Sequence, residues 1–584
     1  MIRTIRVAPF FTSALMAICV LLGMSTTSAR TLVNPEDATG WTEKSLSRAQ
    51  THMVSTANPH ASRAGLAILD VGGSAVDAAI AAQLVLSLVE PQSSGLGGGG
   101  FMVVFDAATQ RLRTYDARET APAHSDKGHF RVDGELLSFW EAVNSGLSVG
   151  PPGLLRGLES MHADGGRLPW AELFKPAIKL AREGFAVSPR LHGLLQRNQK
   201  LRESASARSY FYDESGTPRP VGYVLKNPAL ADVLEQVAQQ GADAFYKGVI
   251  AHDIVRAVAA HPTPGTLSLP DLVYYDAVSR EPLCVAYLEY ELCGMGPPSS
   301  GPVTVMQILL LLTHTDILDH APDSVQAVHL FAEAGKLACA DRDMYIADPD
   351  FVPFPVDTLL ASDYIARRAA LIDPFRAMSR ARAGNPVGQS ATFGKDRSPE
   401  LPSTTHVSVV DAQGNVVSMT TSVESAFGSK IMVRGFLLNN QLTDFSLRGT
   451  DEAGMPVANR VEPGKRPRSS MAPMIVLRDG QPYMAIGAPG GPFIISFVAK
   501  TLLGVLGWGL DIQTAIELPN RGSCNYGTEI EKGTTLEALS GPLEQMGHDV
   551  RLESLPSGLQ GVVIEPGGLE GGADPRREGV ALGR

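Results

Sequence analysis

Two β-prone runs on either side of residue 413 constrain the fold of this chain more than any other feature. Residues 403–410 (STTHVSVV) and 416–422 (VVSMTTS) flank the loop DAQGN at 411–415. Asp, Gly and Asn favour turns, so we predict an antiparallel β-hairpin. A loop centred on Gln413 places Thr404 opposite Ser422, one hydroxyl group facing another. Our hypothesis is that Thr404 is a nucleophile that becomes a new N-terminus when the chain cuts itself.

The stretch before this hairpin is typical of a loop. Residues 383–388 read AGNPVG and residues 397–402 read RSPELP. We predict an exposed, poorly ordered approach to the first strand, which is where a chain cut disturbs the structure least.

Chain length and charge limit the possible architectures and partners. The 584 residues are 44% hydrophobic, which is enough for one or more large cores. Length alone allows about three or four domains, but large layered α/β units run longer. The net charge is −11, and Lys and Arg form no long runs. A nucleic-acid partner is therefore not expected, because phosphate binding needs clustered positive charge.

The N-terminus has the features of a secretory signal peptide. Arg3 and Arg6 precede an apolar run at 14–23, and Thr27-Ser28-Ala29 follows it. A positive region, a short apolar region and small residues at a cleavage site form this pattern, which we assign to residues 1–29. A membrane anchor is the weaker alternative, because the run is shorter than the ~20 residues that span a bilayer. We expect a soluble, exported protein without a membrane anchor, located in the periplasm.

Two cysteines flank a short predicted hairpin. Cys284 and Cys293 enclose the run VAYLEYEL, which we expect to turn at Leu288-Glu289. In that register the cysteines are cross-strand partners, and an exported protein can keep a disulfide. No cysteine spacing resembles a zinc site, and we expect no metal.

Two glycine-rich stretches allow more than one interpretation. Residues 95–100 (GLGGGG) match the letters of a dinucleotide-binding loop, but they follow a helix pattern and precede a strand, the reverse of what that loop requires. A tight crossover into a central strand explains them better. Gly490 and Gly491 precede a helix pattern, so their N–H groups form either an oxyanion pocket or a plain turn.

Together these stretches resemble the γ-glutamyltranspeptidase family of N-terminal-nucleophile hydrolases, over nearly the whole chain after residue 30. The motifs that carry the resemblance occur in the family's order. They are 72–79 (GGSAVDAA), 95–100 (GLGGGG), 404–406 (TTH), 438–441 (LNNQ) with Asp444, 468–471 (RSSM), 489–491 (PGG) and 572–576 (GADPR).

The resemblance implies a fold and a processing event. The family fold is of the α+β class, a four-layer αββα sandwich. Thr404 would be freed by self-cleavage after Ser403, giving a large subunit of residues 30–403 and a small subunit of residues 404–584. These two subunits would form a heterodimer.

The resemblance also implies the roles of individual residues. Thr404 would attack a γ-glutamyl donor such as glutathione, and water, an amino acid or a peptide would accept the group, with no cofactor. In the site, Arg118, Ser469 and Ser470 would hold the donor's α-carboxylate, and Gln441 and Asp444 would hold its α-amino group. Gly490 and Gly491 would form the oxyanion hole. Ser422 would hydrogen-bond the nucleophile. Arg and Asp suit the two ends of a zwitterion.

Several positions depart from the family pattern. Ser422 stands where Thr is more usual, and Pro492 where Ser is frequent. The segment 445–468 is short for members with a lid loop. Glu424 replaces an Asn, and we predict that it shares the strand face of Ser422 and adds a second carboxylate near the ammonium.

Two other functions compete with a γ-glutamyl hydrolase and transferase. A related acylase would act on glutaryl side chains, as on β-lactams, and would need no acid for an ammonium. Asp444 and Glu424 argue against it. An uncleaved, non-catalytic protein on the same fold is the second alternative, and the intact Thr404-Thr405-His406 motif argues against that.

Overall fold

The computed structural model describes residues 39–386, 393–396, 398, 399 and 403–584. The predicted signal peptide lies outside the described residues, as does much of the loop before Ser403. No helix within the described ranges combines the length and apolar character needed to cross a membrane.

Two antiparallel seven-stranded sheets form the centre of the fold. The first has the order β1 (Ser47–Ala49), β22 (Gly568–Ala573), β21 (Gln560–Glu565), β17 (Gln481–Gly487), β16 (Met474–Arg478), β11 (Tyr290–Gly294) and β10 (Leu283–Tyr287). The second has the order β23 (Val580–Gly583), β2 (Met53–Thr56), β12 (Thr405–Val410), β13 (Val416–Ser422), β3 (Gly99–Asp106), β4 (Arg111–Ala117) and β9 (Val278–Arg280). Thus each sheet combines strands from both ends of the chain.

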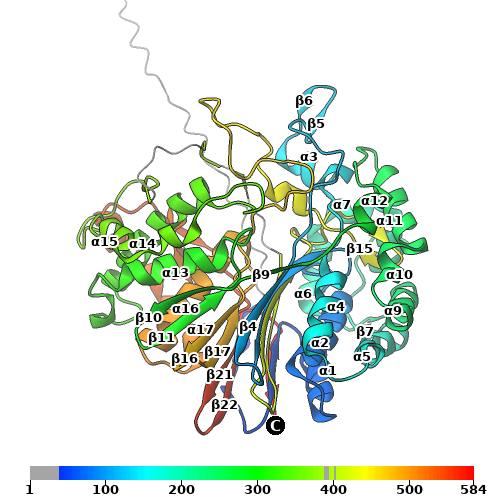
Figure 1. Cartoon of the computed structure of the whole chain (residues 1–584), viewed down its shortest axis with the longest axis horizontal. Coiled ribbons are helices and arrows are strands. Elements are labelled where there is room, and N and C mark those ends of the chain that lie inside the picture. The colour runs from blue at the N-terminus through cyan, green and yellow to red at the C-terminus, as the bar shows by residue number, and fades with distance from the viewer. Residues whose placement is uncertain (1–38, 387–392, 397, 400–402) are drawn as a thin grey trace, which may run out of the picture. The chain divides into compact units, whose positions relative to one another are not determined.

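Helices cover the outer face of each sheet, as Figure 1 shows. The first sheet carries α13 (Gly301–Leu312), α14 (Val325–Tyr345), α15 (Ser362–Ala369), α16 (Ile494–Leu502) and α17 (Ile512–Glu517). The second carries α1 (Pro59–Asp70), α2 (Ala75–Val89), α4 (Leu154–Gly165), α5 (Trp170–Glu183), α6 (Pro189–Arg197), α7 (Gln199–Glu203), α8 (Ala205–Phe211), α9 (Pro228–Gln240), α10 (Asp243–Tyr246), α11 (Val249–Ala259) and α12 (Leu269–Val273).

Smaller elements complete the fold. They are β5 (Arg131–Val132), β6 (Glu135–Leu136), α3 (Phe139–Val143), β7 (Phe185–Ala186), β8 (Val224–Leu225), β14 (Met432–Val433), β15 (Phe436–Leu437), β18 (Arg521–Gly522), β19 (Thr528–Glu531), α18 (Ser540–Gln545) and β20 (Val550–Glu553).

Alternation along the strands separates three apolar layers. On β12, Val407 and Val409 face the helices of the second sheet, whereas Val410 joins a core between the two sheets. On β16, Val476 faces the helices of the first sheet and Ile475 faces the inter-sheet core. Strand side chains alternate between faces, so each central strand serves two cores. The predicted αββα sandwich is confirmed.

The predicted hairpin at residues 403–422 is present in the predicted register. Thr405 pairs with Thr421 and His406 with Thr420, so Thr404 lies at the end of β12 beside Ser422. The glycine-rich stretch is the predicted crossover from α2 into β3. A Cβ atom on Gly98 would lie 2.2 Å from the carbonyl oxygen of Ser422, so only glycine allows this approach to the hairpin.

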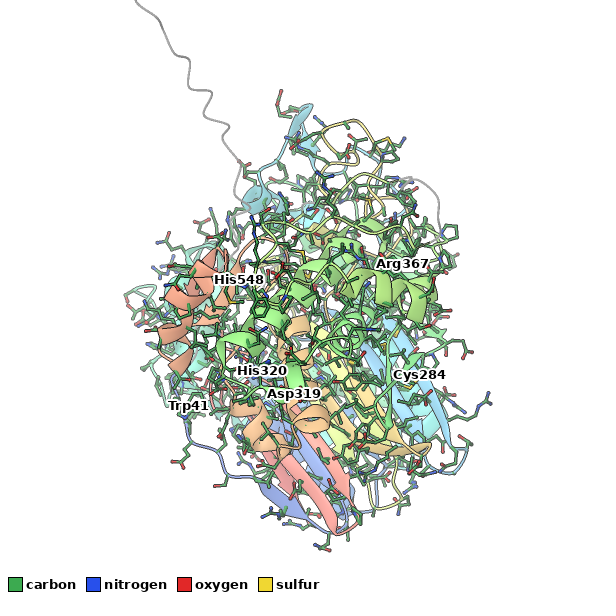
Figure 2. The ribbon with its side chains drawn as sticks, turned by 90° about the vertical axis from the view of Figure 1, so that its left-hand side faces the viewer. Trp41, Cys284, Asp319, His320, Arg367 and His548 are labelled. Atoms are coloured by element: carbon green, nitrogen blue, oxygen red, sulfur yellow. A yellow bond between two sulfur atoms is a disulfide. The ribbon has the colours of Figure 1, made fainter. Side chains whose placement is uncertain are left out.

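Two disulfides stabilise the half of the fold around the first sheet. Cys284 on β10 pairs with Cys293 on β11, as predicted, and Figure 2 labels Cys284. Cys339 on α14 pairs with Cys524 in the loop between β18 and β19. No local pattern predicts this second pair, because its cysteines are 185 positions apart.

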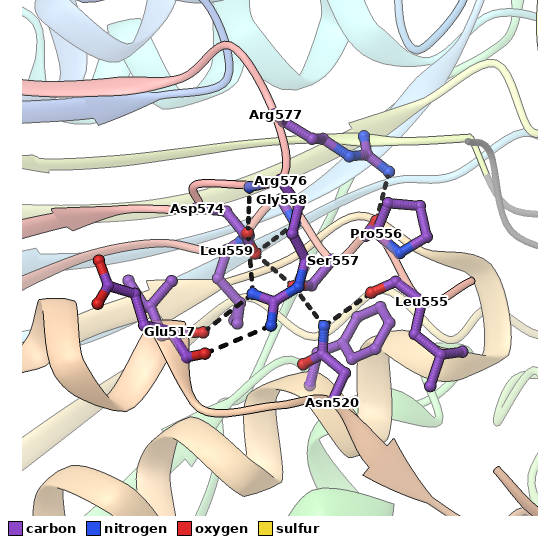
Figure 3. Close-up of polar contacts among 12 residues, drawn as sticks. Glu517, Asn520, Leu555, Pro556, Ser557, Gly558, Leu559, Asp574, Arg576 and Arg577 are labelled. Carbon is purple, nitrogen blue, oxygen red and sulfur yellow. Dashed lines mark hydrogen bonds and ion pairs between the residues drawn. The ribbon is translucent and has the colours of Figure 1, made fainter. Parts of the chain in front are cut away.

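The motif at 572–576 forms a buried polar network near the C-terminus, drawn in Figure 3. The Asp574 carboxylate accepts hydrogen bonds from the backbone N–H groups of Gly558 (2.7 Å) and Leu559 (3.1 Å). Arg576 donates to Glu531 at 2.7 Å. A buried charge is tolerated only when it is paired and hydrogen-bonded, and both charges here meet that condition. The network holds β21 and β22 beside α17 and the loop at 555–558.

Candidate active site

One pocket collects nearly all the residues predicted to act on a substrate. It is lined by Arg118, Thr404, Ser422, Glu424, Gln441, Asp444, Ser469, Ser470, Met471, Gly491 and Ile494. Of the predicted residues, Gly490 and Ser403 are not among the lining residues. These side chains come from distant parts of the sequence, and their roles remain predictions.

Thr404, Ser422 and Ser403 form the chemical centre of the pocket. Thr404 Oγ1 lies 3.3 Å from Ser422 Oγ, to which it donates a hydrogen bond. Ser422 Oγ in turn donates to the carbonyl oxygen of Ser403 at 2.6 Å. That carbonyl belongs to the peptide bond joining Ser403 to Thr404. The Ser422 hydroxyl can therefore polarise this carbonyl while it contacts the neighbouring Thr404 hydroxyl.

The approach to this centre is more buried than the sequence predicted. Asp396, Ser398 and Ser403 are all buried, so the prediction of an exposed loop is wrong for them. Asp396 forms an ion pair with Arg468 at 3.0 Å and accepts a hydrogen bond from Asn459 Nδ2 at 3.1 Å. The charge of Asp396 needs these partners, and they hold this residue inside the protein.

A buried ion pair spans the pocket. Arg118 follows β4 and is fully buried, and its Nη2 donates to Asp444 Oδ2. The same nitrogen donates to the carbonyl oxygen of Arg468 at 3.0 Å, and Nε donates to that of Pro467 at 3.2 Å. Three acceptors thus fix the guanidinium group, whose charge can be shared with a carboxylate ligand.

Glu119 is a second carboxyl group beside Arg118 that was not predicted as a site residue. Its Oε2 lies 3.8 Å from Arg118 Nη1, and the side chain is fully buried. Burial raises the pKa of Glu119 to about 8, although the Arg118 charge opposes the shift. The adjacent Arg-Glu pair after a strand was the only sequence signal for it.

Ser469 and Ser470 lie in the segment 466–471 and are held by Arg342 of α14 and by the backbone of Pro298. Ser470 Oγ accepts a hydrogen bond from Arg342 Nη2 at 2.7 Å, and Arg342 Nε donates to Ser300 Oγ at 2.7 Å. Ser469 is fixed through its backbone N–H, which donates to Pro298 O at 3.0 Å. Arg342 was not predicted as a site residue, because nothing in the run DRD at 341–343 indicates that it lies under the pocket.

Gln441 and Asp444 lie on one short 3₁₀ helix, Gln441–Asp444. Asn459 Nδ2 donates to the carbonyl oxygen of Asp444 at 2.7 Å, which fixes the end of this helix. Gln441 Oε1 is buried and has no hydrogen-bond partner within the described residues. An unpaired buried acceptor is costly, so this atom is ready to accept a hydrogen bond from a ligand.

Gly490 and Gly491 lie between β17 and α16, as the glycine-plus-helix pattern predicted. Their φ angles are +136° and +57°, which residues other than glycine rarely adopt. A Cβ atom on Gly490 would lie 2.7 Å from the ring of Phe497. Both the oxyanion and the plain-turn interpretation are compatible with this geometry.

Glu424 lines the pocket, but not in the predicted way. Strand β13 ends at Ser422, and Glu424 has a φ of +80°, so it does not share the strand face of Ser422. Its backbone N–H instead donates to Ser422 Oγ at 2.8 Å, and its Oε2 accepts a hydrogen bond from Asn440 Nδ2. The chain turns sharply after Ser422, and this turn directs Glu424 into the pocket.

Known proteins match this chain over most of its length. The Gamma-glutamyltranspeptidase family profile matches residues 61–584. A "Glutathione hydrolase proenzyme" of Bacillus subtilis (strain 168) is 37% identical, over 91% of each chain. An "Acylase ACY 1 proenzyme" of Pseudomonas sp. (strain SE83) is 33% identical, over 92% of this chain and 95% of its own.

A solved structure supports the same assignment. The cephalosporin acylase from Bacillus halodurans superposes with a TM-score of 0.80 at 25% identity, over 93% of this chain and 97% of its own. The hairpin at Thr404 and the residues that line its pocket lie within residues 61–584, the range that the family profile matches. The chain therefore belongs to the γ-glutamyltranspeptidase family.

Proposed function

We propose that this protein is a self-processing γ-glutamyl hydrolase and transferase that cleaves γ-glutamyl amides such as glutathione. The observation that carries the proposal is the charge pattern of the pocket around Thr404. Arg118 offers a cation for the donor's α-carboxylate, and Asp444 and Glu424 offer anions for its α-ammonium. Charge-assisted hydrogen bonds of this kind are stronger than neutral ones and select a zwitterion.

The first proposed step is cleavage of the chain. Thr404 Oγ1 attacks the carbonyl carbon of Ser403, the C–N bond breaks, and an ester joins Ser403 to Thr404 Oγ1. Water hydrolyses the ester, leaving a carboxylate on Ser403 and a free hydroxyl and amino group on Thr404. The 2.6 Å hydrogen bond from Ser422 Oγ to the Ser403 carbonyl supports this step, because the oxygen gains negative charge during attack. Both relatives compared above carry the word proenzyme in their names, which agrees with processing.

The second proposed step is γ-glutamyl transfer. The freed α-amino group, with an ordinary pKa of ~7.7–8.0, accepts the Thr404 hydroxyl proton. The Thr404 oxygen attacks the γ-carbonyl of the donor, the amine leaves with a proton, and a γ-glutamyl ester forms. Water or an amino acid or peptide amine then takes the group. Gly490 and Gly491 are the proposed donors to the oxyanion.

A glutaryl acylase is the second candidate, because an acylase is among the matched relatives and a cephalosporin acylase among the matched structures. A glutaryl group has no α-ammonium. It would leave the Asp444 and Glu424 carboxylates facing an apolar methylene, which is unfavourable for buried charges. The pocket chemistry therefore favours the γ-glutamyl donor.

Comparison of two anilides tests the choice. The wild-type protein should hydrolyse γ-glutamyl-p-nitroanilide with a higher kcat/KM than glutaryl-p-nitroanilide. Asp444→Asn should reduce kcat/KM for the first by about 10-fold to 100-fold, the value of a lost hydrogen bond to a charged group. It should affect the second much less. Equal losses for both anilides, or a wild-type preference for the glutaryl compound, would support the acylase.

We also propose export to the periplasm after removal of residues 1–29. The two disulfides support an oxidising location, because cytosolic proteins rarely keep them. Cell fractionation and sequencing of the large fragment test this. The fragment should begin at Arg30, and a retained Met1 would contradict the proposal.

A further inference from the structure

Lys430 lies at the end of the turn that leads away from the catalytic hairpin. The turn comprises residues 423–430, and the Lys430 side chain folds back onto it. Its Nζ donates to Ser425 Oγ at 2.8 Å and to the carbonyl oxygen of Gly428 at 2.6 Å. Lys430 is only 9% exposed, so its charge is directed into the protein and not into solvent.

This turn holds Glu424 in a backbone conformation that needs support. Glu424, Phe427 and Lys430 have φ angles of +80°, +67° and +66°. Such angles are unfavourable for residues other than glycine and persist only where the surroundings fix them. Asn440 provides support on one side, where its Oδ1 accepts from the Ser425 N–H at 2.9 Å and its Nδ2 donates to Glu424. Lys430 provides further support through its hydrogen bonds to Ser425 and Gly428.

The Lys430 ammonium also acts electrostatically on Glu424. Burial lowers the pKa of Lys430 to about 8, and the Glu424 carboxylate opposes that shift. Lys430 is therefore mostly protonated at pH 7. Glu424 and Asp444 line the same pocket, and two negative charges in one site repel each other. The positive charge of Lys430 reduces this repulsion through its interaction with Glu424.

We infer that Lys430 is a positioning residue that fixes the turn carrying Glu424, keeps this side chain directed into the pocket, and so sets the preference for donors with an α-ammonium group. The inference rests on the proposed γ-glutamyl activity. Lys430 does not line the pocket, so it acts on the donor only through Glu424.

The variant Lys430→Met tests this, because it keeps an unbranched side chain that is one atom shorter and removes the charge. We expect KM for γ-glutamyl-p-nitroanilide to rise about fivefold or more, in the range for a weakened hydrogen bond to a charged group. The kcat value should stay within about twofold of the wild type, and KM for glutaryl-p-nitroanilide should change by less than about twofold. Unchanged KM for the γ-glutamyl donor would overturn the inference, as would an equal rise for both donors.

A double-mutant cycle separates action through Glu424 from a general loosening of the turn. In a Glu424→Gln background, Lys430→Met should have little further effect on KM for the γ-glutamyl donor. Multiplicative effects of the two substitutions would overturn the inference.

Two serines of the same turn provide a second, milder comparison if Lys430→Met does not fold or is not cleaved. Ser425→Ala removes one acceptor of Lys430, whereas Ser429→Ala removes a hydrogen bond from Ser429 Oγ to Leu438 O at 3.0 Å. KM for the γ-glutamyl donor should rise in Ser425→Ala and not in Ser429→Ala, and identical values would overturn the inference. Failure of the proposed function would be visible separately, as no γ-glutamyl hydrolysis by the wild type.

The disulfide between Cys339 and Cys524 carries a second, independent inference. The proposed cut between Ser403 and Thr404 falls between these two cysteines. Cys339 would then belong to the large subunit and Cys524 to the small one, whereas Cys284 and Cys293 both precede the cut. We propose that the Cys339–Cys524 disulfide joins the two subunits covalently after processing.

Denaturing gel electrophoresis with and without reductant tests this second proposal. The cleaved wild type should migrate as one band without reductant and as two bands with it. Cys339→Ser/Cys524→Ser should give two bands in both conditions, whereas the control Cys284→Ser/Cys293→Ser should behave as the wild type. Two bands from the wild type without reductant would overturn the proposal. One band with reductant would instead show that the chain is not cut.

Discussion

Arg118 and Asp444 bind each other directly across the pocket, and both side chains are buried. The two groups proposed to bind the opposite ends of the donor thus neutralise each other. Removing one member of a buried ion pair leaves the other charge uncompensated. A zwitterionic donor supplies a carboxylate for Arg118 and an ammonium for Asp444, so binding keeps both charges paired.

This pairing predicts a stability effect in addition to an effect on activity. Arg118→Met should lower the free energy of unfolding by about 3–5 kcal/mol, because Asp444 is left buried without its cation. Arg118→Met/Asp444→Asn should regain part of that stability while both variants lose γ-glutamyl hydrolysis. Urea unfolding and kcat/KM measure the two effects. If the double variant is no more stable than the single one, the pair does not act as described.

Thr404 and its neighbour Thr405 provide a matched test of self-cleavage. Thr404→Ala lacks the attacking oxygen, so we expect an uncut, inactive chain in intact-mass measurements under reducing conditions. Thr405 is buried and its Oγ1 has no hydrogen-bond partner within the described residues. Thr405→Val keeps its shape, so this control should be cut and active. Cutting of Thr404→Ala between residues 403 and 404 would point to a different nucleophile.

Ser422 should affect the rate of cleavage more than the fold. Its hydroxyl donates to the Ser403 carbonyl and accepts from Thr404, so Ser422→Ala removes a donor to the developing oxyanion. Loss of one such donor typically costs about 10²–10³-fold in rate. Ser422→Thr keeps the hydroxyl and should be cut at nearly the normal rate. A time course of cutting in freshly folded protein measures both, and normal cutting of Ser422→Ala would exclude this role.

The burial of His406 predicts how the stability of the protein depends on pH. It is fully buried, its Nδ1 and Nε2 contact Thr420 Oγ1 (2.8 Å) and Ser408 Oγ (3.0 Å), and burial lowers its pKa to about 3. The unfolded imidazole has a pKa of ~6.5, so between these values only the unfolded state takes up the proton. Stability from a neutral His406 is therefore present above about pH 6.5 and is lost as pH falls toward 3.

The variant His406→Asn isolates this contribution. Between pH 6 and 4, the free energy of unfolding should fall less steeply in the variant than in the wild type, by up to about 1.4 kcal/mol per pH unit, the value for one proton. Urea unfolding at several pH values measures the slopes. Parallel pH curves for the two proteins would show that His406 does not titrate on unfolding.

Local patterns were sufficient for the hairpins, the glycine crossover and one disulfide. The turn at 411–415 determines which residues of β12 and β13 pair, and the turn at Leu288-Glu289 does the same for Cys284 and Cys293. These features depend on contacts between residues close in sequence. The motif order of the chain also indicated the αββα fold and the set of residues around the pocket.

The sequence alone determined the identity of the chemical groups, and the tertiary structure decided how they pair. Contacts such as Arg118 with Asp444, Ser470 with Arg342, and Cys339 with Cys524 join segments far apart in the chain. Their partners follow from how the two sheets and their helices pack, which no local pattern encodes. Even for Glu424, two residues from Ser422, the strand period predicted the wrong backbone conformation, although the residue lines the pocket. There the backbone turns to satisfy contacts with Asn440 and Lys430, and tertiary packing overrides the local pattern.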